Sequence, residues 1–498
     1  MKFAFLPSAS IFSRMQRFDY DVAVIGGGSG GYAAARTTAG AGLKTLVIEG
    51  GKEVGGLCIL RGCMPTKALL YAAEVMHLAG HPDPWGIRAG KVGFDFKKVM
   101  ARKNALIKEF ADCRVKQLNT GNFKFVRAHA RFVDKHTVEP SRERRLPAGR
   151  TDDGDLKAPP AGSRRSRMLT AKHFVIATGS TIAPTPLSQL DEVGFITSDE
   201  ALALKRLPKS LIVLGGGPTA CEFAQFFARF GVQVTLVQRS EHILKEFDPD
   251  AAAEIEKVFR REGIKIFTNT KLEGARRKGK LKSVSFERGG KLVSVAAEEI
   301  LFALGRIPNT ASLNLAKAGV KTDGGRIIAN DFMRTSAPHI YTAGDCTGPH
   351  EIVHLAVQQG EIAAHNIANP KSQRVMDYRL VISVVFTEPQ VAFAGLTEKE
   401  ATARGIPCRA ASYPFNDHGK SLIMEAKDGF VKLLAEPRTG EILGGACVGP
   451  AGGELIHEIV AAMAKRMSVQ ELARLPHYHP TLAEIWSYPA EELAGKAR

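Results

Sequence analysis

The sequence has little of what a secreted or membrane-spanning protein needs. Only seven of its 498 residues are cysteines, an odd number with one close pair, which argues against a secreted disulfide framework. No run of 18 apolar residues occurs, so we expect no membrane partner. Aromatic residues make up 7% of the chain against 49 glycines, a composition typical of a glycine-rich α/β protein. The cysteine usage favours a reducing, cytoplasmic location.

Positive charge is abundant but scattered. The formal net charge is +17, yet no aromatic-interleaved nucleic-acid motif accompanies it, so we expect no nucleic-acid partner. Part of the excess lies in residues 141–168, where seven arginines stand among proline, glycine and aspartate, a composition that predicts a solvated insertion loop. Residues 1–17 are basic, but their apolar stretch is too short for a secretory signal, and we interpret them as an N-terminal extension.

Two segments share the pattern of a strand, a glycine turn and a helix. They begin at YDVAVIGGGSGGYAAARTTA (residues 20–39) and at LIVLGGGPTACEFAQFFARFG (residues 211–231). About 190 residues separate them, which is too far for two halves of one six-stranded sheet. Each turn is therefore predicted to open its own dinucleotide-binding fold, and the chain to bind two dinucleotides.

The first turn carries the GxGxxG pattern at Gly26, Gly28 and Gly31. Glycines there let the backbone approach a pyrophosphate held at a helix N-terminus. Glu49 ends the next strand, about 20 residues on, where a carboxylate accepts hydrogen bonds from a ribose 2′-hydroxyl. This site suits a nucleotide that has no 2′-phosphate.

The second turn is the GxGxxA variant. Its residues are Gly215, Gly217 and Ala220. The strand after it ends in Gln238 and Arg239, where an acid is expected, so no carboxylate holds a 2′-hydroxyl. Arg239, with Lys245 six residues on, can instead pair with a 2′-phosphate. NADPH is therefore favoured over NADH, and an exposed basic turn is the alternative interpretation.

A third motif, GGLCILRGCMPTK (residues 55–67), places Cys58 and Cys63 just before a helix predicted to start near Pro65. A helix N-terminus and the nearby Lys67 lower the pKa of a thiol, which favours a thiolate on Cys63. Structural zinc takes four ligands, and no second cysteine pair of this kind exists. We therefore expect a redox-active pair and no metal.

These motifs resemble the class I pyridine nucleotide–disulfide oxidoreductases, a family that includes dihydrolipoamide dehydrogenases, glutathione reductases and mercuric reductases. Further segments similar to the family follow in its order: ATGS at 177–180, ALGRIPN at 303–309, YTAGDC at 341–346 and HPTLAE at 479–484. The resemblance covers nearly the whole chain. It implies an FAD-dependent enzyme that exchanges electrons between NADPH, or NADH, and a small disulfide or dithiol.

The resemblance also implies roles for individual residues. Lys67 and Glu222 are expected to form an ion pair beside the flavin, and Asp345 to bind the ribityl and phosphate portion of FAD. The expected FAD contacts are Gly26, Gly28, Ser29, Gly31, Glu49, Gly56, Lys67, Thr178, Gly179, Gly344 and Asp345. The expected NAD(P) contacts are Gly215, Gly217, Ala220, Glu222, Gln238, Arg239, Lys245 and Gly305.

His479 and Glu484, both in HPTLAE, are similar to the base and orienting carboxylate of the family. A carboxylate that fixes one ring nitrogen sets the tautomer and raises the basicity of the other, as a proton shuttle between thiols requires. In the family this pair reaches the cysteines of the opposite subunit. The resemblance therefore implies a homodimer.

The expected fold is α/β, with two Rossmann-like dinucleotide-binding domains, for FAD and NAD(P), and a C-terminal α+β dimerisation domain. Residues 18–180 and 306–373 are expected to bind FAD, 181–305 to bind NAD(P)H and 374–498 to form the dimerisation domain, with helices near 452–474 and 481–494.

The substrate is the least specified property. Ser29 and Arg36 match positions that contact glutathione in glutathione reductases, but Glu361 replaces an arginine there and should repel a carboxylate. The tail AEELAGKAR lacks the terminal cysteine pair of mercuric reductases. A dihydrolipoamide dehydrogenase-like enzyme is the first hypothesis. The alternatives are a glutathione or other low-molecular-weight disulfide reductase, a mercuric, metal or quinone flavin reductase, and the flavoprotein subunit of a larger complex.

Overall fold

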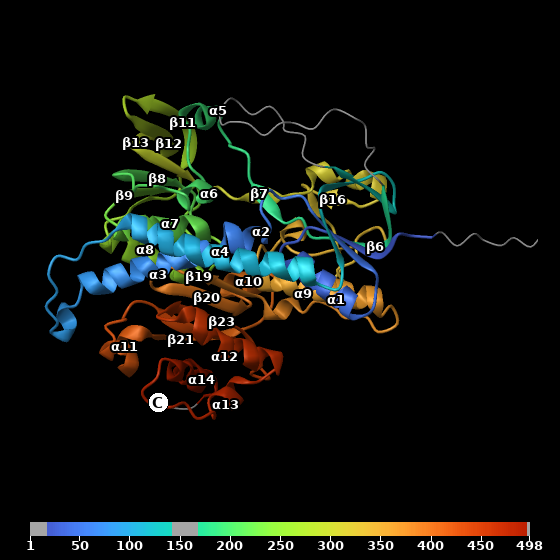
Figure 1. The fold of residues 1–498 in the computed structure, drawn as a ribbon. Helices are drawn as coiled ribbons and strands as arrows, with labels where there is room; N and C mark the ends of the chain where they lie inside the picture. Colours follow the sequence, from blue (N-terminus) through green and yellow to red (C-terminus); the bar gives the residue numbers. More distant parts are fainter. Residues whose placement is uncertain (1–16, 142–167, 496–498) are drawn as a thin grey trace, which may run out of the picture.

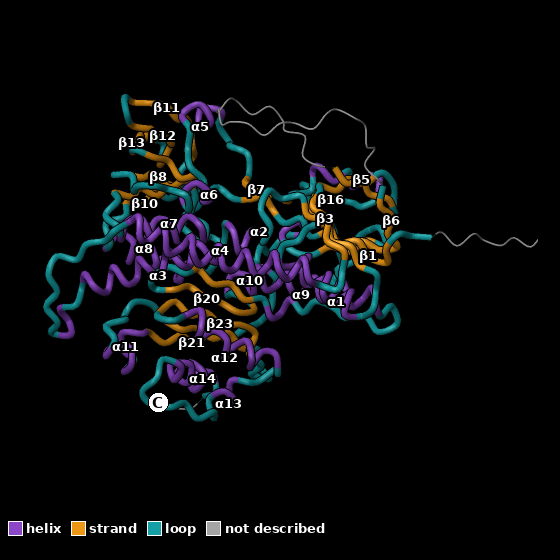
Figure 2. The backbone as a smooth tube through the Cα atoms, in the orientation of Figure 1, coloured by secondary structure: helices purple, strands orange, loops and turns teal. Residues whose placement is uncertain are grey.

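A computed structural model gives the fold and describes residues 17–141 and 168–495. Most of the N-terminal extension and of the predicted insertion loop lies outside the described residues. The described residues form three units, each built on one main sheet with its helices (Figures 1 and 2).

The first sheet has seven strands. Five are parallel in the order β3-β2-β1-β6-β18, and the antiparallel pair β5-β4 continues from β6. Their bounds are β1 Tyr20–Ile25, β2 Thr45–Glu49, β3 Lys124–Arg127, β4 His129–Phe132, β5 Thr137–Ser141, β6 Leu169–Ile176 and β18 Ile340–Thr342. The central strands are almost fully buried, as a parallel sheet covered on both faces requires. The insertion thus joins two antiparallel neighbours, β5 and β6.

Helices α1 (Ser29–Gly40) and α9 (Val353–Ala368) cross each other on this sheet, although more than 300 residues separate them in the chain (Figure 1). Their backbones meet at Gly30 and Gly360. A Cβ on Gly360 would lie 2.2 Å from the carbonyl oxygen of Gly30. The return of α9 therefore closes the first glycine turn from outside, and only glycine fits at the crossing.

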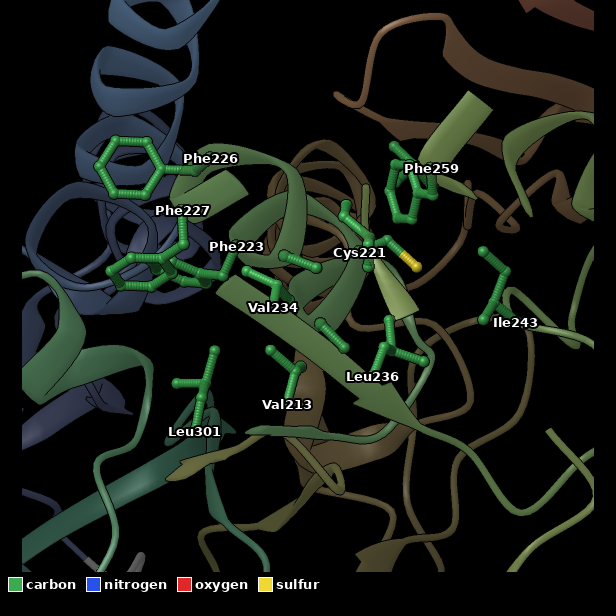
Figure 3. Packing of buried hydrophobic residues seen from close by; sticks show 14 of the residues in the cluster. Val213, Cys221, Phe223, Phe226, Phe227, Val234, Leu236, Ile243, Phe259 and Leu301 are labelled. Carbon is green, nitrogen blue, oxygen red and sulfur yellow. The ribbon is translucent and has the colours of Figure 1, made fainter. Parts of the chain in front are cut away.

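The second sheet is parallel, in the order β10-β9-β8-β14, with a three-stranded antiparallel sheet, β11-β12-β13, beside it. The bounds are β8 Ser210–Leu214, β9 Gln233–Val237, β10 Lys265–Phe267, β11 Lys271–Lys278, β12 Leu281–Arg288, β13 Lys291–Ala297 and β14 Glu299–Phe302. Helices α7 (Pro218–Arg229) and α8 (Pro249–Arg261) cover it. Phe223, Phe226 and Phe227 of α7 belong to one buried cluster with Val213 and Leu236 of the sheet (Figure 3).

The third sheet is antiparallel, in the order β19-β20-β23-β22-β21, and belongs to a C-terminal α+β unit (Figure 2). Its strands are β19 Ile382–Val385, β20 Gln390–Gly395, β21 Arg409–Pro414, β22 Phe430–Ala435 and β23 Ile442–Gly449. Three helices pack on it: α12 Gly452–Ala464, α13 Val469–Leu472 and α14 Ser487–Leu493. The helix predicted near 452–474 is two helices, because Ser468 caps a new one with its side chain.

Two long helices, α3 (Cys63–Gly80) and α4 (Phe96–Thr120), run between the sheets and contact each other (Figure 1). The short helix α2 (Gly56–Leu60) precedes α3. Within residues 17–141 and 168–495, no helix combines the length and the apolar character needed to cross a bilayer.

Candidate active site

The first glycine turn is closed tightly on itself. A Cβ on Gly31 would lie 1.9 Å from the carbonyl oxygen of Gly26, which leaves no room for a side chain. Glu49 anchors the neighbouring strand end, since its two carboxylate oxygens accept hydrogen bonds from the N–H of Gly27 (2.6 Å) and of Gly51 (2.5 Å). The predicted acid therefore lies against the turn.

The surface beside this turn fits a dinucleotide. Gly28 and Gly56 approach so closely that a Cβ on Gly56 would lie 2.7 Å from the Cα of Gly28, and Ser29 begins helix α1 there. Thr178 has a buried hydroxyl oxygen without a hydrogen-bond partner among the described residues. A narrow glycine cradle and an unused buried polar atom are what an extended phosphate-bearing ligand occupies and satisfies.

Asp345 lies at the end of a hydrogen-bonded chain that joins the sheets. Ser180 donates to its carboxylate at 2.6 Å, and the Nε of Arg306 donates to the Ser180 hydroxyl at 2.8 Å. The N–H of the preceding Gly344 donates to Gln359 of α9 at 2.8 Å. The predicted contacts Gly179 and Gly305 lie next to Ser180 and Arg306, in strands β7 (Ser180–Ile182) and β15 (Arg306–Pro308) that pair.

The second glycine turn is more open. Nothing lies within 4 Å of a Cβ built on Gly217, at the N-terminus of α7, and Ala220 already carries a side chain where the first turn has Gly31. Gln238 is buried, packs against Gly216 and accepts a hydrogen bond from the N–H of Arg239 at 3.1 Å. These contacts hold Gln238 against the second turn.

The two basic residues beside the second turn differ in whether their side chains form ion pairs. The Arg239 side chain is exposed, and within the described ranges it has neither an ion pair nor a side-chain hydrogen bond. Lys245 pairs with Glu246 at 3.3 Å. Arg239 is the more available of the two for an anionic group.

The cysteine pair lies at the junction of two helices. Cys58 is in α2, and Cys63 is the first residue of α3, so the helix begins two residues earlier than predicted. Both are free and half-buried. The pKa of Cys63 is lowered to about 7, first because Cys58 donates a hydrogen bond to it and also because the Lys67 ammonium is close. The same hydrogen bond raises the pKa of Cys58, which keeps its proton.

Lys67 and Glu222 form the predicted ion pair. The Nζ of Lys67 donates to both carboxylate oxygens at 2.9 Å, and the Glu222 side chain is only 6% exposed. Phe386 holds the pair in two ways that the sequence does not reveal: its N–H donates to Glu222 at 3.0 Å, and its ring centroid lies 4.6 Å from the Lys67 ammonium. A nearly buried pair costs desolvation, and these contacts offset part of it.

His479 and Glu484 also lie together. The Nδ1 of His479 is 3.0 and 3.2 Å from the two oxygens of Glu484. The carboxylate is buried, whereas the imidazole is 76% exposed. In the described part of one chain neither cysteine contacts this pair, which lies in the C-terminal unit. The exposed ring is free to meet a second molecule.

Arg36 and Glu361 form an ion pair between α1 and α9, and both side chains are about half-exposed. Glu361 is predicted to repel a substrate carboxylate, and Arg36 would attract one. Because the two side chains pair with each other, each compensates the charge of the other.

Two Rossmann-like units, a cysteine pair with an acidic thiol and an adjacent lysine–glutamate pair define a dinucleotide-dependent thiol oxidoreductase. Comparison with known proteins specifies the class further. The family model for pyridine nucleotide-disulphide oxidoreductases matches residues 20–360, and the model for the dimerisation domain of that family matches 381–489. The chain belongs to the pyridine nucleotide-disulphide oxidoreductase family.

Individual relatives agree with the family models. The chain is 34% identical to the dihydrolipoyl dehydrogenase of Bacillus subtilis, over 96% of its own length and 99% of the relative's. It is 32% identical to the mercuric reductase of Bacillus cereus, over 94% of its own length but only 70% of that protein. Among solved structures, LpdA from Mycobacterium tuberculosis superposes with a TM-score of 0.82 at 26% identity, covering 95% of this chain and 99% of that one.

These comparisons confirm several predictions. The fold class is confirmed, and the chain is an FAD-dependent, NAD(P)-linked disulfide oxidoreductase. The dimerisation domain supports a homodimer.

Proposed function

We propose that this enzyme exchanges electrons between NADPH and a small dithiol or disulfide of the lipoamide class, as dihydrolipoyl dehydrogenases act on a dihydrolipoyl group. One observation carries the proposal: Cys63, with its pKa near 7, lies beside the Lys67–Glu222 pair and in hydrogen-bond contact with Cys58. A thiolate at neutral pH is needed for thiol–disulfide exchange. The identity with dihydrolipoyl dehydrogenases and the Arg36–Glu361 pair favour a lipoamide over a glutathione substrate.

The chain's own groups provide the cofactor sites. Gly28, Glu49, Thr178 and Asp345 are the residues that would hold FAD along the first turn, and Lys67 would contact it next to the cysteines. FAD supplies hydride acceptance and delivery when bound. In the second dinucleotide-binding unit, the open turn at Gly217 and the N-terminus of α7 would hold the pyrophosphate of the nicotinamide nucleotide.

The cysteines carry the exchange with substrate. His479 takes the proton of the Cys58 thiol, and the resulting thiolate attacks one sulfur of the substrate disulfide. A mixed disulfide forms, and the first substrate sulfur leaves as a thiolate that takes this proton back from His479. The Cys63 thiolate then attacks the Cys58 sulfur and restores the Cys58–Cys63 disulfide, and the second substrate sulfur leaves as a thiolate that takes a proton from solvent. Two electrons pass to the substrate, and the reverse sequence oxidises a dithiol. Because His479 of one subunit is exposed, it serves the cysteines of the other subunit in the homodimer.

Arg239 is the residue that would distinguish the nucleotides. Its exposed, unengaged guanidinium follows the second strand of the NAD(P) unit, where a 2′-phosphate lies in dinucleotide folds. A planar guanidinium binds phosphate through two parallel hydrogen bonds. We therefore assign the preference for NADPH to Arg239, with Lys245 in a lesser role.

The test is anaerobic reduction of the purified enzyme by NADPH and by NADH, followed by turnover with lipoamide. With NADPH a long-wavelength absorption between the Cys63 thiolate and the flavin should appear. Since a thiolate exists above its pKa and is lost below it, this band should fade as the pH drops through about 7. The Cys58→Ser variant should keep the band and lose turnover with lipoamide. Undiminished turnover in that variant would instead establish a flavin reductase in which the cysteines play no part.

A further inference from the structure

Glu484 has a second imidazole on its buried side. The Nε2 of His418 lies 3.3 Å from the same carboxylate oxygen, Oε1, that the Nδ1 of His479 approaches at 3.2 Å. His418 is fully buried, whereas His479 is exposed. The carboxylate thus lies between one ring that faces solvent and one that is enclosed.

We propose that His418 is a positioning residue: its Nε2 faces the Glu484 carboxylate at 3.3 Å from the buried side, and this polar contact sets the pH at which His479 takes up a proton. The inference rests on the proposed function of the His479–Glu484 pair and adds a third member to it. His418 is fully buried, so we place its effect on Glu484 and not on the substrate.

Ser421 occupies the other ring nitrogen of His418. Its Nδ1 lies 2.8 Å from the hydroxyl of Ser421 in α11 (Gly419–Ile423). A neutral imidazole has one donor and one acceptor nitrogen. When the Ser421 hydroxyl donates to Nδ1, Nε2 carries the hydrogen and points its N–H dipole toward the Glu484 carboxylate, 3.3 Å away.

The surroundings keep His418 neutral. Burial lowers its pKa, and among the charged groups near it Glu484 raises that pKa while His479 lowers it. The other polar groups that face it are the backbone of Thr481 and the side chain of Tyr488 in α14, whose ring centroid lies 6.3 Å away. The adjacent Asp417 carboxylate is engaged by the Tyr413 hydroxyl at 3.0 Å. A neutral donor therefore faces the ionised Glu484.

Removing this donor changes the proton affinity of the exposed ring. The contact with the His418 N–H stabilises the ionised carboxylate most when His479 is neutral, because a protonated His479 already compensates the charge. Without it, the deprotonated state of the pair becomes less favourable, and the pair holds its proton to higher pH. We expect an upward shift of about 0.5–1 pH unit.

The experiment compares three variants of the full-length enzyme with the parent. Flavin reduction by dihydrolipoamide is followed anaerobically across pH, since this half-reaction requires His479 to accept a proton. His418→Leu should move the midpoint of the profile upward by about 0.5–1 unit and slow reduction about threefold to tenfold below that midpoint. His418→Gln, whose amide nitrogen replaces Nε2, should restore the profile. His477→Leu is the matched control, because His477 pairs with Glu458 at 2.7 Å and does not contact Glu484.

Flavin reduction by NADPH provides the second readout and should be unchanged in all variants, since it does not involve the pair. An unmoved midpoint in His418→Leu would overturn the proposal. So would an equal loss at every pH that His418→Gln fails to repair, which identifies a packing role. If the parent is not reduced by dihydrolipoamide at any pH, the proposed function fails first and the inference falls with it.

If His418→Leu proves too unstable to purify, Ser421→Ala decides the question. It leaves the ring in place but frees its tautomer, and it should give a smaller upward shift. No shift in Ser421→Ala would then overturn the proposal.

Discussion

The two glycine turns have the same backbone and opposite degrees of closure. Gly26 and Gly215 begin them with φ of +106° and +114°, which few residues other than glycine adopt. In the first turn the third position is Gly31, packed against a carbonyl oxygen, and α9 crosses outside it. In the second turn the third position is Ala220, and the space around Gly217 is open.

This difference matches how the two nucleotides are used. FAD remains bound through catalysis, so a turn closed by α9 and anchored by Glu49 costs nothing in turnover. A nicotinamide nucleotide binds and leaves in every cycle, which an open turn with one exposed arginine permits. Both turns contain the glycine motif, so the motif does not distinguish them. The crossing of α9 over the first turn is what separates the site of a permanently bound nucleotide from the site of one that exchanges in each cycle.

The largest effect is expected from Gly31→Ala. The new Cβ would lie 1.9 Å from the Gly26 carbonyl oxygen, and neither backbone segment can move while α9 holds α1. The variant should purify with less than about a tenth of the flavin of the parent. Flavin content per polypeptide measures this directly. Retention of full flavin would mean that the first turn is as open as the second.

The next effect concerns the acid that anchors the first turn. Glu49→Gln preserves shape but loses the charge and one of two hydrogen bonds from the N–H groups of Gly27 and Gly51. FAD should bind about 10–100-fold more weakly, as measured by flavin fluorescence on dilution. Glu53→Gln is the control, because Glu53 is exposed and pairs only loosely with Arg61, at 3.4 Å. Equal affinities in the two variants would contradict a role for Glu49.

Arg239→Ala tests the open turn. Loss of the phosphate partner should raise the KM for NADPH about tenfold and leave that for NADH within twofold, since NADH has no 2′-phosphate. Steady-state kinetics with both nucleotides gives the ratio. Lys265→Ala, an exposed lysine in β10, should change neither value. A parallel rise for both nucleotides would show that Arg239 acts through structure.

Much of this comparison is visible in the sequence, because strands, glycine turns and strand-end residues are local. Pattern and spacing predict that Gly26 and Gly215 begin turns and that Glu49 and Arg239 lie at or after strand ends, and the fold has them there. The closure of the first turn by α9 could not be predicted, because nothing in the local sequence indicates that residues 353–368 return to cross α1. Strand β18 has only three residues, so its sequence does not indicate that it pairs with β6 and extends the first sheet.

In the redox centre, too, some features can be predicted from the sequence and others cannot. The cysteine spacing and the Lys67–Glu222 pair follow from motifs, whereas three partners depend on tertiary packing. These are Phe386 beside Lys67, Glu361 beside Arg36 and His418 behind Glu484. Each comes from a segment far from its partner in the chain, where pattern and periodicity carry no information.

The smallest effect is expected from the reverse substitution at the equivalent position of the second turn. Ala220→Gly gives the second turn the glycine of the first, but Ala220 already fits without a clash, so no close approach is gained. The cost should be that of glycine near the start of α7, about 1 kcal/mol in the free energy of unfolding. Flavin content and the KM for NADPH should stay within twofold of the parent. A marked improvement in nucleotide binding would show that the alanine restricts the second turn, and the contrast between a closed and an open turn would then lie in this one methyl group and not in the crossing of α9.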